Sequence, residues 1–438
     1  MAVLVVLIGT RGAGKTTVLE FLRENGVFVL TPSTDRLPRD GEDSEYHFEA
    51  AWPSTDLEWV INVDKHKYGM RRSEVDELTK RGVGATVFEP GNVGVLEEFR
   101  LRGRAEVVTL GLDTVKSVEE QERRVGTDEG RVVSERKLES DRRVVEDCDA
   151  VLQGTAGVIG EAALVVCNVL GSRGGVLEGT ALRALMRAGT LLTDGNEENV
   201  QGASYDLRLG EQAWCQGEFV FLSRQNPSLS IPAYSYAIVT AQEEARIPRF
   251  LTGRYDLTVS GFMDGLVLSN GPQVDPGYRG SLFCTLFNGR DVARGVTLGR
   301  HFATIEFVTT TRVSEGYSGE YQDKKDLAAF VSENTAVSPG GNIVERIDNL
   351  ERSIDDKVAP VRQFWFGSLG IVILIHMILA GWVWLGGSDL VASLTKDAKQ
   401  DKQEIQLEQN SDGNREGTGQ MFQKKGDDRK VEQFREPQ

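Results

Sequence analysis

Apolar and polar positions follow two different patterns along the first 310 residues. Up to about residue 170, apolar runs such as "VLVVLIG" and "AEVVTLGL" alternate with stretches of helical spacing such as "KTTVLEFLREN". Buried parallel strands are continuous apolar runs joined by crossover helices, so this rhythm predicts an α/β domain with a mostly parallel sheet over residues 1–170. The opening "MAVLVVLI" runs straight into a glycine loop, which favours a buried strand over a signal peptide.

Residues 175–315 have a different texture. After one helical stretch, "TALRALMRAG", short alternating segments such as "EFVFLS" and "FATIEFV" are separated by turn residues. This pattern is typical of an antiparallel barrel or sandwich, and we expect a mainly antiparallel β barrel here. "GSRGG" at 171–175 is the predicted hinge between the two domains.

Beyond the barrel the pattern becomes helical. Ile343, Ile347, Leu350 and Ile354 have 4-3-4 spacing, which predicts an amphipathic helix over 342–358. A seam of about two heptads is short for an independent coiled coil. Two interpretations remain open: the helix joins chains that something else brings together, or it packs on its own barrel.

Residues 364–387 form an apolar stretch of about 24 residues with tryptophans near both ends. Such a length spans a hydrocarbon layer of ~30 Å, and tryptophan favours the interfaces, so we expect a single-pass transmembrane helix. The segment 388–438 is charged, Gln-rich and poor in aromatic residues, which predicts a disordered polar tail.

Composition narrows the function classes. The net charge of −16 over 438 residues argues against nucleic-acid binding and against a general affinity for anionic surfaces. Cys148, Cys167, Cys215 and Cys284 are scattered without metal-ligand spacing, so we expect free buried thiols in a reducing compartment.

The stretch "GTRGAGKT" satisfies G-x4-G-K-[ST] and lies between a predicted strand and a predicted helix. Its backbone N–H groups would surround a triphosphate, Lys15 would reach the β and γ oxygens, and Thr16 would hold Mg²⁺. We therefore predict an ATP site that uses Mg²⁺. The expected binding residues are Gly9, Gly12, Gly14, Lys15, Thr16 and Thr17.

The next segment, "TPSTDRLPRDGEDSEYHF", resembles the acceptor-binding segment of guanylate kinases. The resemblance implies that Arg36, Arg39 and Tyr46 hold the phosphate of a nucleoside monophosphate. Further along, "LEWVINVDKHKYGM" is similar to the family's L-E-W…Y-G segment, which adds Glu58 and Tyr68 as substrate-binding residues.

"ERRVGTDEGRVVSERKLESD" resembles the arginine-bearing lid of the same family. The resemblance implies that Arg124 and Arg136 act with Lys15 as catalytic residues, by neutralising the transferring phosphoryl group. Transfer would then depend on positioning and charge neutralisation, with no covalent intermediate.

The departures from the family pattern concern the base. Pro32, Asp35 and Met70 stand where guanylate kinases have base-contacting hydroxyl residues, and Glu89 is the nearest carboxylate to an Asp expected after "ATVF". We expect phosphoryl transfer to a monophosphate whose base need not be guanine. A degenerate kinase fold kept for scaffolding is the alternative.

"GASYDLRLG", "GRYDL" and "QVDPGYRGSLFCTLFN" together resemble the dCTP deaminase / dUTPase superfamily. The resemblance implies that Arg254 and Asp275 bind nucleotide. However, Tyr255 and Asp256 replace the phosphate-gripping serines, and Thr285 stands where the deaminases have their general-base glutamate. We therefore expect a barrel that has lost deaminase chemistry, although a retuned hydrolase using Asp275, or a purely structural Asp275, remains open.

These observations lead to one overall hypothesis. The chain is a membrane-anchored nucleotide protein in which the first domain transfers a phosphoryl group and the barrel binds or senses a nucleoside triphosphate. The superfamily resemblance implies a homo-oligomer, possibly a trimer, and ATP use places the N-terminal domains in the cytoplasm. The rivals are a catalytic barrel (dUTP hydrolysis or dCTP deamination) with a regulatory P-loop domain, and a non-catalytic nucleotide-sensing membrane effector.

Overall fold

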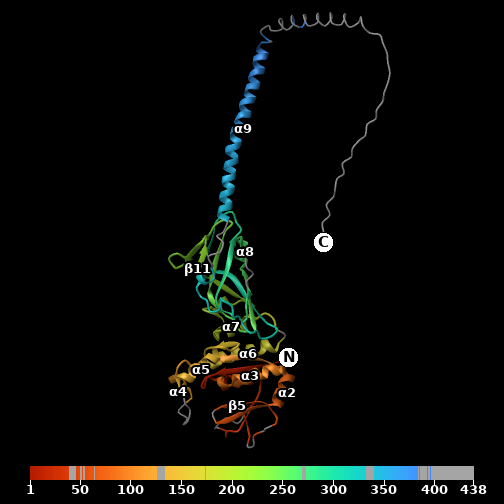
Figure 1. Cartoon of the computed structure of the whole chain (residues 1–438), viewed down its shortest axis with the longest axis vertical. Coiled ribbons are helices and arrows are strands. Elements are labelled where there is room, and N and C mark those ends of the chain that lie inside the picture. The colour runs from red at the N-terminus through yellow and green to blue at the C-terminus, as the bar shows by residue number, and fades with distance from the viewer. Residues whose placement is uncertain are drawn as a thin grey trace, which may run out of the picture. The chain divides into compact units, whose positions relative to one another are not determined.

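The computed structural model describes residues 1–38, 46–49, 52, 55–63, 65–125, 134–172, 174–268, 273–331, 340–382, 384, 392 and 395. Residues Met1–Arg346 form one compact unit, and Ile347–Gln438 form a second. Both β domains lie in the first unit (Figure 1).

The first domain is built on a five-stranded sheet in the order β2-β7-β1-β8-β9. All of its strand pairs are parallel, and every residue of the central strand β1 is buried. The apolar run at the start of the chain is therefore the centre of the sheet, as its composition predicts. The elements of this domain are β1 (Ala2–Gly9), α1 (Lys15–Glu24), β2 (Phe28–Val29), β3 (Ser33–Thr34), β4 (His47–Phe48), β5 (Leu57–Val63), β6 (His66–Arg71), α2 (Arg72–Arg81), β7 (Val83–Phe88), η1 (Pro90–Asn92), α3 (Val93–Arg102), β8 (Ala105–Leu112), α4 (Val118–Val125), α5 (Glu135–Glu146), β9 (Ala150–Leu152) and α6 (Ala156–Gly171).

A small second sheet completes this domain, in the order β4-β3-β6-β5. It is inserted between β2 and α2, and Trp59 and Met70 from it pack into one core with Phe88 of the large sheet. Trp59 lies edge-on to Phe99 of α3, with ring centroids 4.8 Å apart. This insertion holds the second half of the candidate site.

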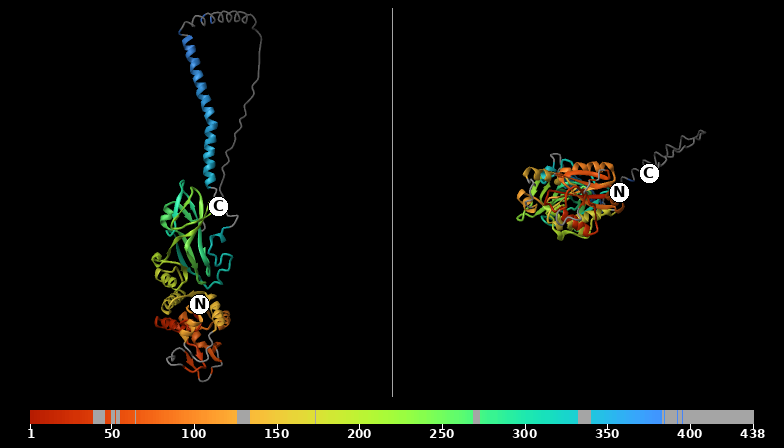
Figure 2. Two further views of the ribbon diagram at one scale, coloured as in Figure 1. Left: turned by 90° about the vertical axis from the view of Figure 1, so that its left-hand side faces the viewer. Right: turned by 90° about the horizontal axis from the view of Figure 1, so that it is seen from below.

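The second domain contains a curled antiparallel sheet of nine strands, in the path β16-β18-β14-β11-β20-β15-β17, with β10 on β14 and β12 on β11. Figure 2 shows these strands, green to cyan, as a β body distinct from the red-to-orange sheet of the first domain. The elements are α7 (Gly179–Arg187), β10 (Leu191–Thr193), η2 (Glu197–Asn199), β11 (Tyr205–Cys215), β12 (Glu218–Phe221), β13 (Ser228–Ile231), β14 (Tyr236–Arg246), β15 (Leu251–Leu257), α8 (Val259–Met263), β16 (Leu266–Leu268), β17 (Gln273–Val274), β18 (Arg279–Asn288), β19 (Arg294–Thr297), β20 (His301–Thr309) and η3 (Leu327–Ala329).

The two domains share one hydrophobic core. Buried residues of α6, such as Ile159 and Val166, belong to the same cluster as Leu182 of α7 and Phe307 of β20. The "GSRGG" segment predicted as a hinge thus joins domains that pack on one another. The chain after β20 also remains on the barrel, because Ser281 N donates to Lys324 O at 2.9 Å.

The segment expected at 342–358 and residues 364–382 of the segment expected at 364–387 lie in one helix, α9 (Gly340–Trp382). Pro360 lies inside it, and Ile347, Leu350 and Ile354 of the predicted seam are exposed. The stretch Asn349–Trp382 is long and apolar enough to cross a membrane, judged by length and composition alone. Apart from residues 392 and 395, the predicted tail lies outside the described residues.

All four cysteines are free and buried, as the sequence predicts. Burial raises the pKa of the Cys148 and Cys167 thiols to about 12. Burial also raises the pKa values of Cys215 and Cys284. At neutral pH these groups are therefore neutral thiols.

Candidate functional site

A cavity of about 760 Å³ opens on the first domain, between the loop after β1 and the small sheet. Of the residues predicted from the sequence, its lining includes Gly12, Gly14, Lys15, Thr16, Arg36, Tyr46, Tyr68 and Arg124. The structure thus brings the predicted phosphate loop and the predicted acceptor residues to one cavity.

The loop after β1 has the backbone of an anion cradle. Gly12 and Gly14 have φ of +78° and +87°, in the left-handed region that favours glycine. Gly14 is also the N-cap of α1 and provides no side-chain cap, so the first turn of the helix directs uncapped N–H groups at this cavity. Gly9 lets the loop pack closely, because a Cβ at this position would lie only 2.9 Å from the Cβ of Ala13.

Lys15 is held inside the loop by oxygen atoms. Its Nζ donates to Gly9 O at 2.6 Å and lies 3.2 Å from Glu89 Oε1. Glu89 directly follows β7, and the parallel register Ile8↔Phe88 brings that strand end beside the loop. The sequence left the role of Glu89 open; the strand register makes it the carboxylate partner of Lys15.

Arg124 reaches the same loop from α4. Its Nη1 donates to Gly12 O at 3.3 Å and to Thr114 Oγ1 at 3.2 Å, and its Nη2 donates to Glu120 at 2.7 Å. By contrast, Arg136 is exposed in the first turn of α5, and neither Arg136 nor Thr17 lines the cavity. Of the predicted arginine pair, only Arg124 therefore lies at the site.

Arg36, Tyr46 and Tyr68 form a compact cluster on the acceptor side. Arg36 is buried, its Nε donates to Tyr68 Oη at 3.1 Å, and its guanidinium lies 4.8 Å from the centroid of the Tyr46 ring. The two tyrosine rings meet edge to face at 5.6 Å. A guanidinium and two phenols can bind a phosphate monoester together. Arg39 lies outside the described residues.

The wall where a base would lie is mainly apolar. The apolar lining includes Pro32, Trp59, Ile61 and Met70, and Thr86 and His66 add polar groups. Asp35 does not line this wall, because its Oδ1 accepts the Lys67 N–H at 2.9 Å. A wall of this kind provides shape and few hydrogen bonds for a base.

Glu58 is not part of the cavity. Its carboxylate, 6 % exposed, lies 3.3 Å from Arg102 Nη1 and 2.8 Å from Arg104 Nη1. It therefore fastens the small sheet to α3 and the residue before β8. The sequence motif predicts that Glu58 binds the substrate. The motif does not reveal the two arginines, because they lie more than 40 positions away in the sequence.

The two barrel residues that stand in place of the expected serines differ in burial: Tyr255 packs inside the barrel and Asp256 is exposed. Tyr255 is buried, and its hydroxyl donates to Phe283 O inside the barrel. Burial raises its pKa well above the usual value. Asp256 accepts the adjacent Leu257 N–H at 2.7 Å.

Arg254 and Asp275 are both exposed, and neither lines a cavity described for the barrel. β15 pairs with β17 through Arg254↔Gln273, which places Asp275 two positions beyond the partner of Arg254.

Sequence reasoning missed one buried charged cluster in the barrel. Glu243 is fully buried, and it accepts the Arg208 Nε–H at 2.7 Å, the Arg208 backbone N–H at 3.0 Å and the Tyr205 hydroxyl at 2.8 Å. These contacts join β11 to β14 and satisfy the carboxylate. The sequence pattern shows that these residues are polar, but it does not indicate that they contact one another.

Within the residues that the structure describes, no group of three His, Cys, Asp or Glu side chains is placed to hold a metal ion. A magnesium ion that is bound mainly by phosphate oxygens and water needs only a hydroxyl and a nearby carboxylate from the protein. Thr16 in the first turn of α1 and Glu89 beside Lys15 meet that requirement.

Comparison with known proteins yields relatives for each half of the first unit. A dCTP deaminase of Thermococcus kodakarensis is 32% identical over 144 residues, which cover 33% of this chain and 92% of that protein. A guanylate kinase of Fusobacterium nucleatum is 31% identical over 147 residues, 31% of this chain and 78% of that protein.

Among solved structures, a guanylate kinase from Anaplasma phagocytophilum covers 38% of this chain and 85% of its own, at 18% identity and a TM-score of 0.29. A scan against models of known protein families finds no match.

Proposed function

Because the chain belongs both to the guanylate kinase family and to the dCTP deaminase family, we propose that it is a nucleotide enzyme whose first domain transfers a phosphoryl group from ATP to a nucleoside monophosphate. One observation carries the proposal: a single cavity holds both the glycine loop with Lys15 and the cluster of Arg36, Tyr46 and Tyr68. A kinase needs this arrangement, because donor and acceptor phosphates must meet in line.

The roles of the residues follow from their present partners. Lys15 now binds Gly9 O and Glu89, and it would exchange these oxygens for those of the donor phosphates. Arg124 already lies against the loop and would add positive charge at the transferring group. Arg36 and the two tyrosines would fix the acceptor phosphate.

Magnesium, when bound, neutralises the charge of the donor phosphates. Thr16 would hold the ion, and Glu89 would orient its water ligands.

The acceptor base is proposed to be one that need not be guanine. Pro32 and Met70 line the wall where the base would lie, and the Asp35 carboxylate is engaged with Lys67 N. A site that is specific for guanine needs hydrogen-bond partners for the polar edge of the base, because polar groups that are buried without partners lower the affinity. This wall favours a base that is recognised by shape.

The barrel is proposed to bind a nucleotide without deaminating it. Deamination needs a group that shuttles protons, and Thr285 lies on β18 where the resemblance places the glutamate. Tyr255 occupies the sequence position where the resemblance implies a phosphate-binding serine, and its side chain points into the barrel core.

α9 is proposed to anchor the protein in a membrane, with residues 1–346 in the cytoplasm where ATP is available. Assembly into a homo-oligomer, possibly a trimer, is part of the same proposal.

The decisive experiment incubates the full chain, in mild detergent, with MgATP and each nucleoside or deoxynucleoside monophosphate. We expect at least one monophosphate to stimulate ADP formation, and Lys15→Ala to abolish it, because the loop lysine contacts the transferring group. The exposed Arg224→Gln serves as the matched control.

If no monophosphate stimulates Lys15-dependent ADP formation, the kinase proposal is wrong. A parallel incubation with each dNTP tests the catalytic-barrel rival, since that enzyme would consume dCTP or dUTP.

A further inference from the structure

A second cavity, of about 240 Å³, lies between the two domains of the first unit. The first domain contributes Arg143 and residues 146–151, with the acidic side chains of Glu146, Asp147 and Asp149. The barrel domain contributes Thr190, Arg246, Arg249 and Arg279, among others. None of these residues lines the kinase cavity. The cavity exists only because the two domains are joined.

Two arginines of the barrel face this cavity from adjacent strands. Arg246 on β14 and Arg279 on β18 are direct cross-strand partners in the antiparallel register. Like charges in this position repel one another and destabilise a sheet. Burial, followed by the charge of Arg279, lowers the pKa of Arg246, and the charges of Asp113 and Glu146 oppose this effect.

The two guanidiniums differ in their partners: in the part of the chain that the structure describes, Arg279 is paired with a carboxylate of the surface, and Arg246 is not. Among the described residues no carboxylate oxygen lies within 4.0 Å of Arg246, whose Nη1 is 3.5 Å from Gly189 O. Arg279 Nη2 donates to the exposed Asp323 at 3.2 Å. The Nε atom of Arg279 lies 3.0 Å from the same carboxylate, within ion-pair distance. This nitrogen atom is buried and makes no hydrogen bond to the residues that the structure describes.

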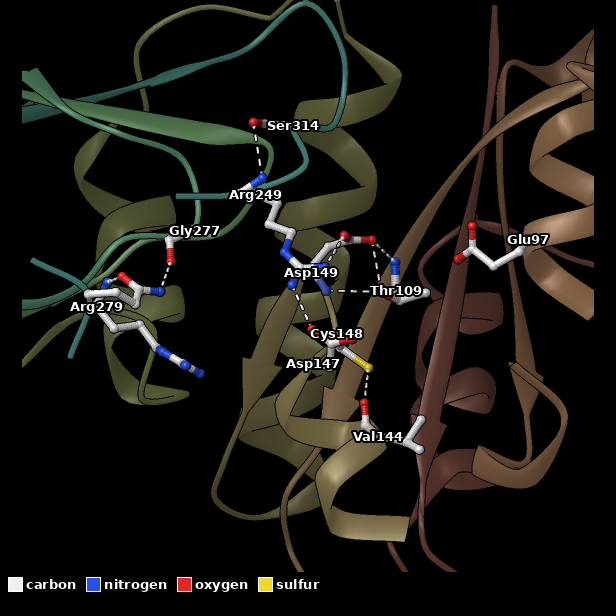
Figure 3. A network of polar contacts seen from close by, with 12 residues as sticks. Glu97, Thr109, Val144, Asp147, Cys148, Asp149, Arg249, Gly277, Arg279 and Ser314 are labelled. Atoms are coloured by element: carbon white, nitrogen blue, oxygen red, sulfur yellow. Dashed lines mark hydrogen bonds and ion pairs between the residues drawn. The ribbon is translucent and has the colours of Figure 1, made fainter. Parts of the chain in front are cut away.

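The opposite wall is held by an ion-pair network that spans the domains (Figure 3). Arg249 donates to Asp147 at 2.7 Å and lies 3.7 Å from Asp149. Asp149 in turn accepts the Thr109 backbone N–H at 2.7 Å and its hydroxyl at 2.8 Å, and it lies 3.2 Å from Arg100. Asp147 and Asp149 already have partners. Glu146, on the same wall, opposes the charge repulsion at Arg246 only in part, because among the described residues it makes no ion pair with Arg246 within 4.0 Å.

We propose that this interdomain cavity binds a phosphate group between Arg246 and Arg279. A guanidinium presents paired N–H donors that match phosphate oxygens, and a doubly charged anion can serve two guanidiniums at once. Binding would replace the repulsion between β14 and β18 with attraction to a shared anion. The phosphate is either free inorganic phosphate or part of a nucleotide.

The site would make domain docking responsive to phosphate. Arg246 and Arg279 belong to the barrel, whereas Asp147 and Asp149 on the facing wall belong to the first domain. An anion held here is therefore enclosed by both domains. It stabilises the docked arrangement in proportion to its concentration, as any ligand of the folded state does.

The test uses the full chain in mild detergent with Lys15→Ala in the background, which weakens phosphate binding at the kinase cavity. Binding of inorganic phosphate, pyrophosphate and a nucleoside monophosphate is measured by isothermal titration calorimetry, and the rise in Tm that each causes is recorded. We expect Arg246→Gln and Arg279→Gln each to raise the Kd of the tightest of these ligands by about tenfold or more, because each removes a charged donor.

Two controls separate binding from folding. Arg224→Gln, at an exposed arginine outside the cavity, should leave the Kd unchanged. Arg246→Gln should not lower the Tm in phosphate-free buffer, because it relieves a like-charge pair, while the phosphate-dependent rise in Tm should disappear.

The ligand that binds most tightly shows whether the site takes free phosphate or the phosphate of a nucleotide. Either result supports the proposed phosphate site. The proposal is overturned if Arg246→Gln and Arg279→Gln bind every one of these ligands as the background chain does. It is equally overturned if the background chain binds none of them.

Discussion

At the scale of single residues, the cavity of the first domain is lined by cationic side chains that are paired with neighbouring groups of the chain. Lys15 is bound to Gly9 O and Glu89, Arg124 to Gly12 O and Glu120, and Arg36 to Tyr68. These contacts keep the positive groups in place without a ligand. A phosphate would compete with them for the same N–H groups.

Arg36→Lys tests the acceptor side. Lysine keeps the charge but loses the planar fork and the hydrogen bond to Tyr68, so we expect KM for the monophosphate to rise about tenfold and kcat to change less. Steady-state kinetics at saturating ATP measure both parameters, with Arg224→Lys as the matched control. An unchanged KM would show that Arg36 does not contact the acceptor.

Much of the phosphate loop could be predicted from sequence because its contacts are local. Spacing alone places Gly12, Gly14 and Lys15, and the backbone angles follow from the need for left-handed glycines. Glu89 and Glu58 could not be placed in this way. Glu89 reaches Lys15 through the register of β1 and β7, and Glu58 is paired with two arginines from distant elements.

At the scale of elements, the parallel sheet and the curled antiparallel sheet were predictable because period and composition differ between them. Their docking was not predictable. It depends on pairs such as Arg249 and Asp147, 102 positions apart, and on a backbone bond from Arg249 N to Asp149 O at 2.8 Å. Nothing in the local pattern around either residue indicates its partner.

Arg249→Leu tests this junction. The change removes the cross-domain partner of two carboxylates, one of them buried, and we expect the free energy of unfolding to fall by about 2 kcal/mol at pH 7 after allowance for the partial exposure of Arg249. Thermal unfolding in phosphate-free buffer, followed by tryptophan fluorescence, provides the measurement.

The loss should depend on pH. Burial raises the pKa of Asp149, and the charge of Arg249 opposes that rise, so the variant raises this pKa further. When a carboxyl group has a higher pKa in the folded state than in the unfolded state, the free energy of unfolding of the protein falls as pH rises. The fall extends from the unfolded pKa of ~3.9 to the folded pKa. The deficit of the variant should therefore be smaller at pH 4 than at pH 7, and an equal deficit at both would exclude Asp149 as its source.

At the scale of the whole molecule, the two compact units have different surfaces. The unit that carries both β domains buries apolar residues in two clusters, one of which runs through both domains. The apolar residues of α9 between Phe364 and Leu379 are exposed, among them Ile371, Leu374 and Met377. Exposed apolar side chains over this length are the surface that a membrane span would present.

We expect the full chain to remain with membranes through alkaline carbonate extraction. Ile371→Lys with Leu374→Lys should release it, because each charge near the middle of a span costs ~2.5–3.5 kcal/mol on insertion. The size-matched pair Ile371→Leu with Leu374→Ile is the control and should stay in the pellet. Release of the unmodified chain would show that α9 is not an anchor.

The four buried cysteines have a practical consequence. Each thiol is shielded, and burial raises the pKa of every one of them, so reagents that attack thiolates should leave the native chain unmodified. One cysteine introduced at an exposed position of each β domain would then carry a fluorophore or spin label without prior removal of the natural ones. The spacing between labelled positions on the two β domains would become measurable in the unaltered background of this protein.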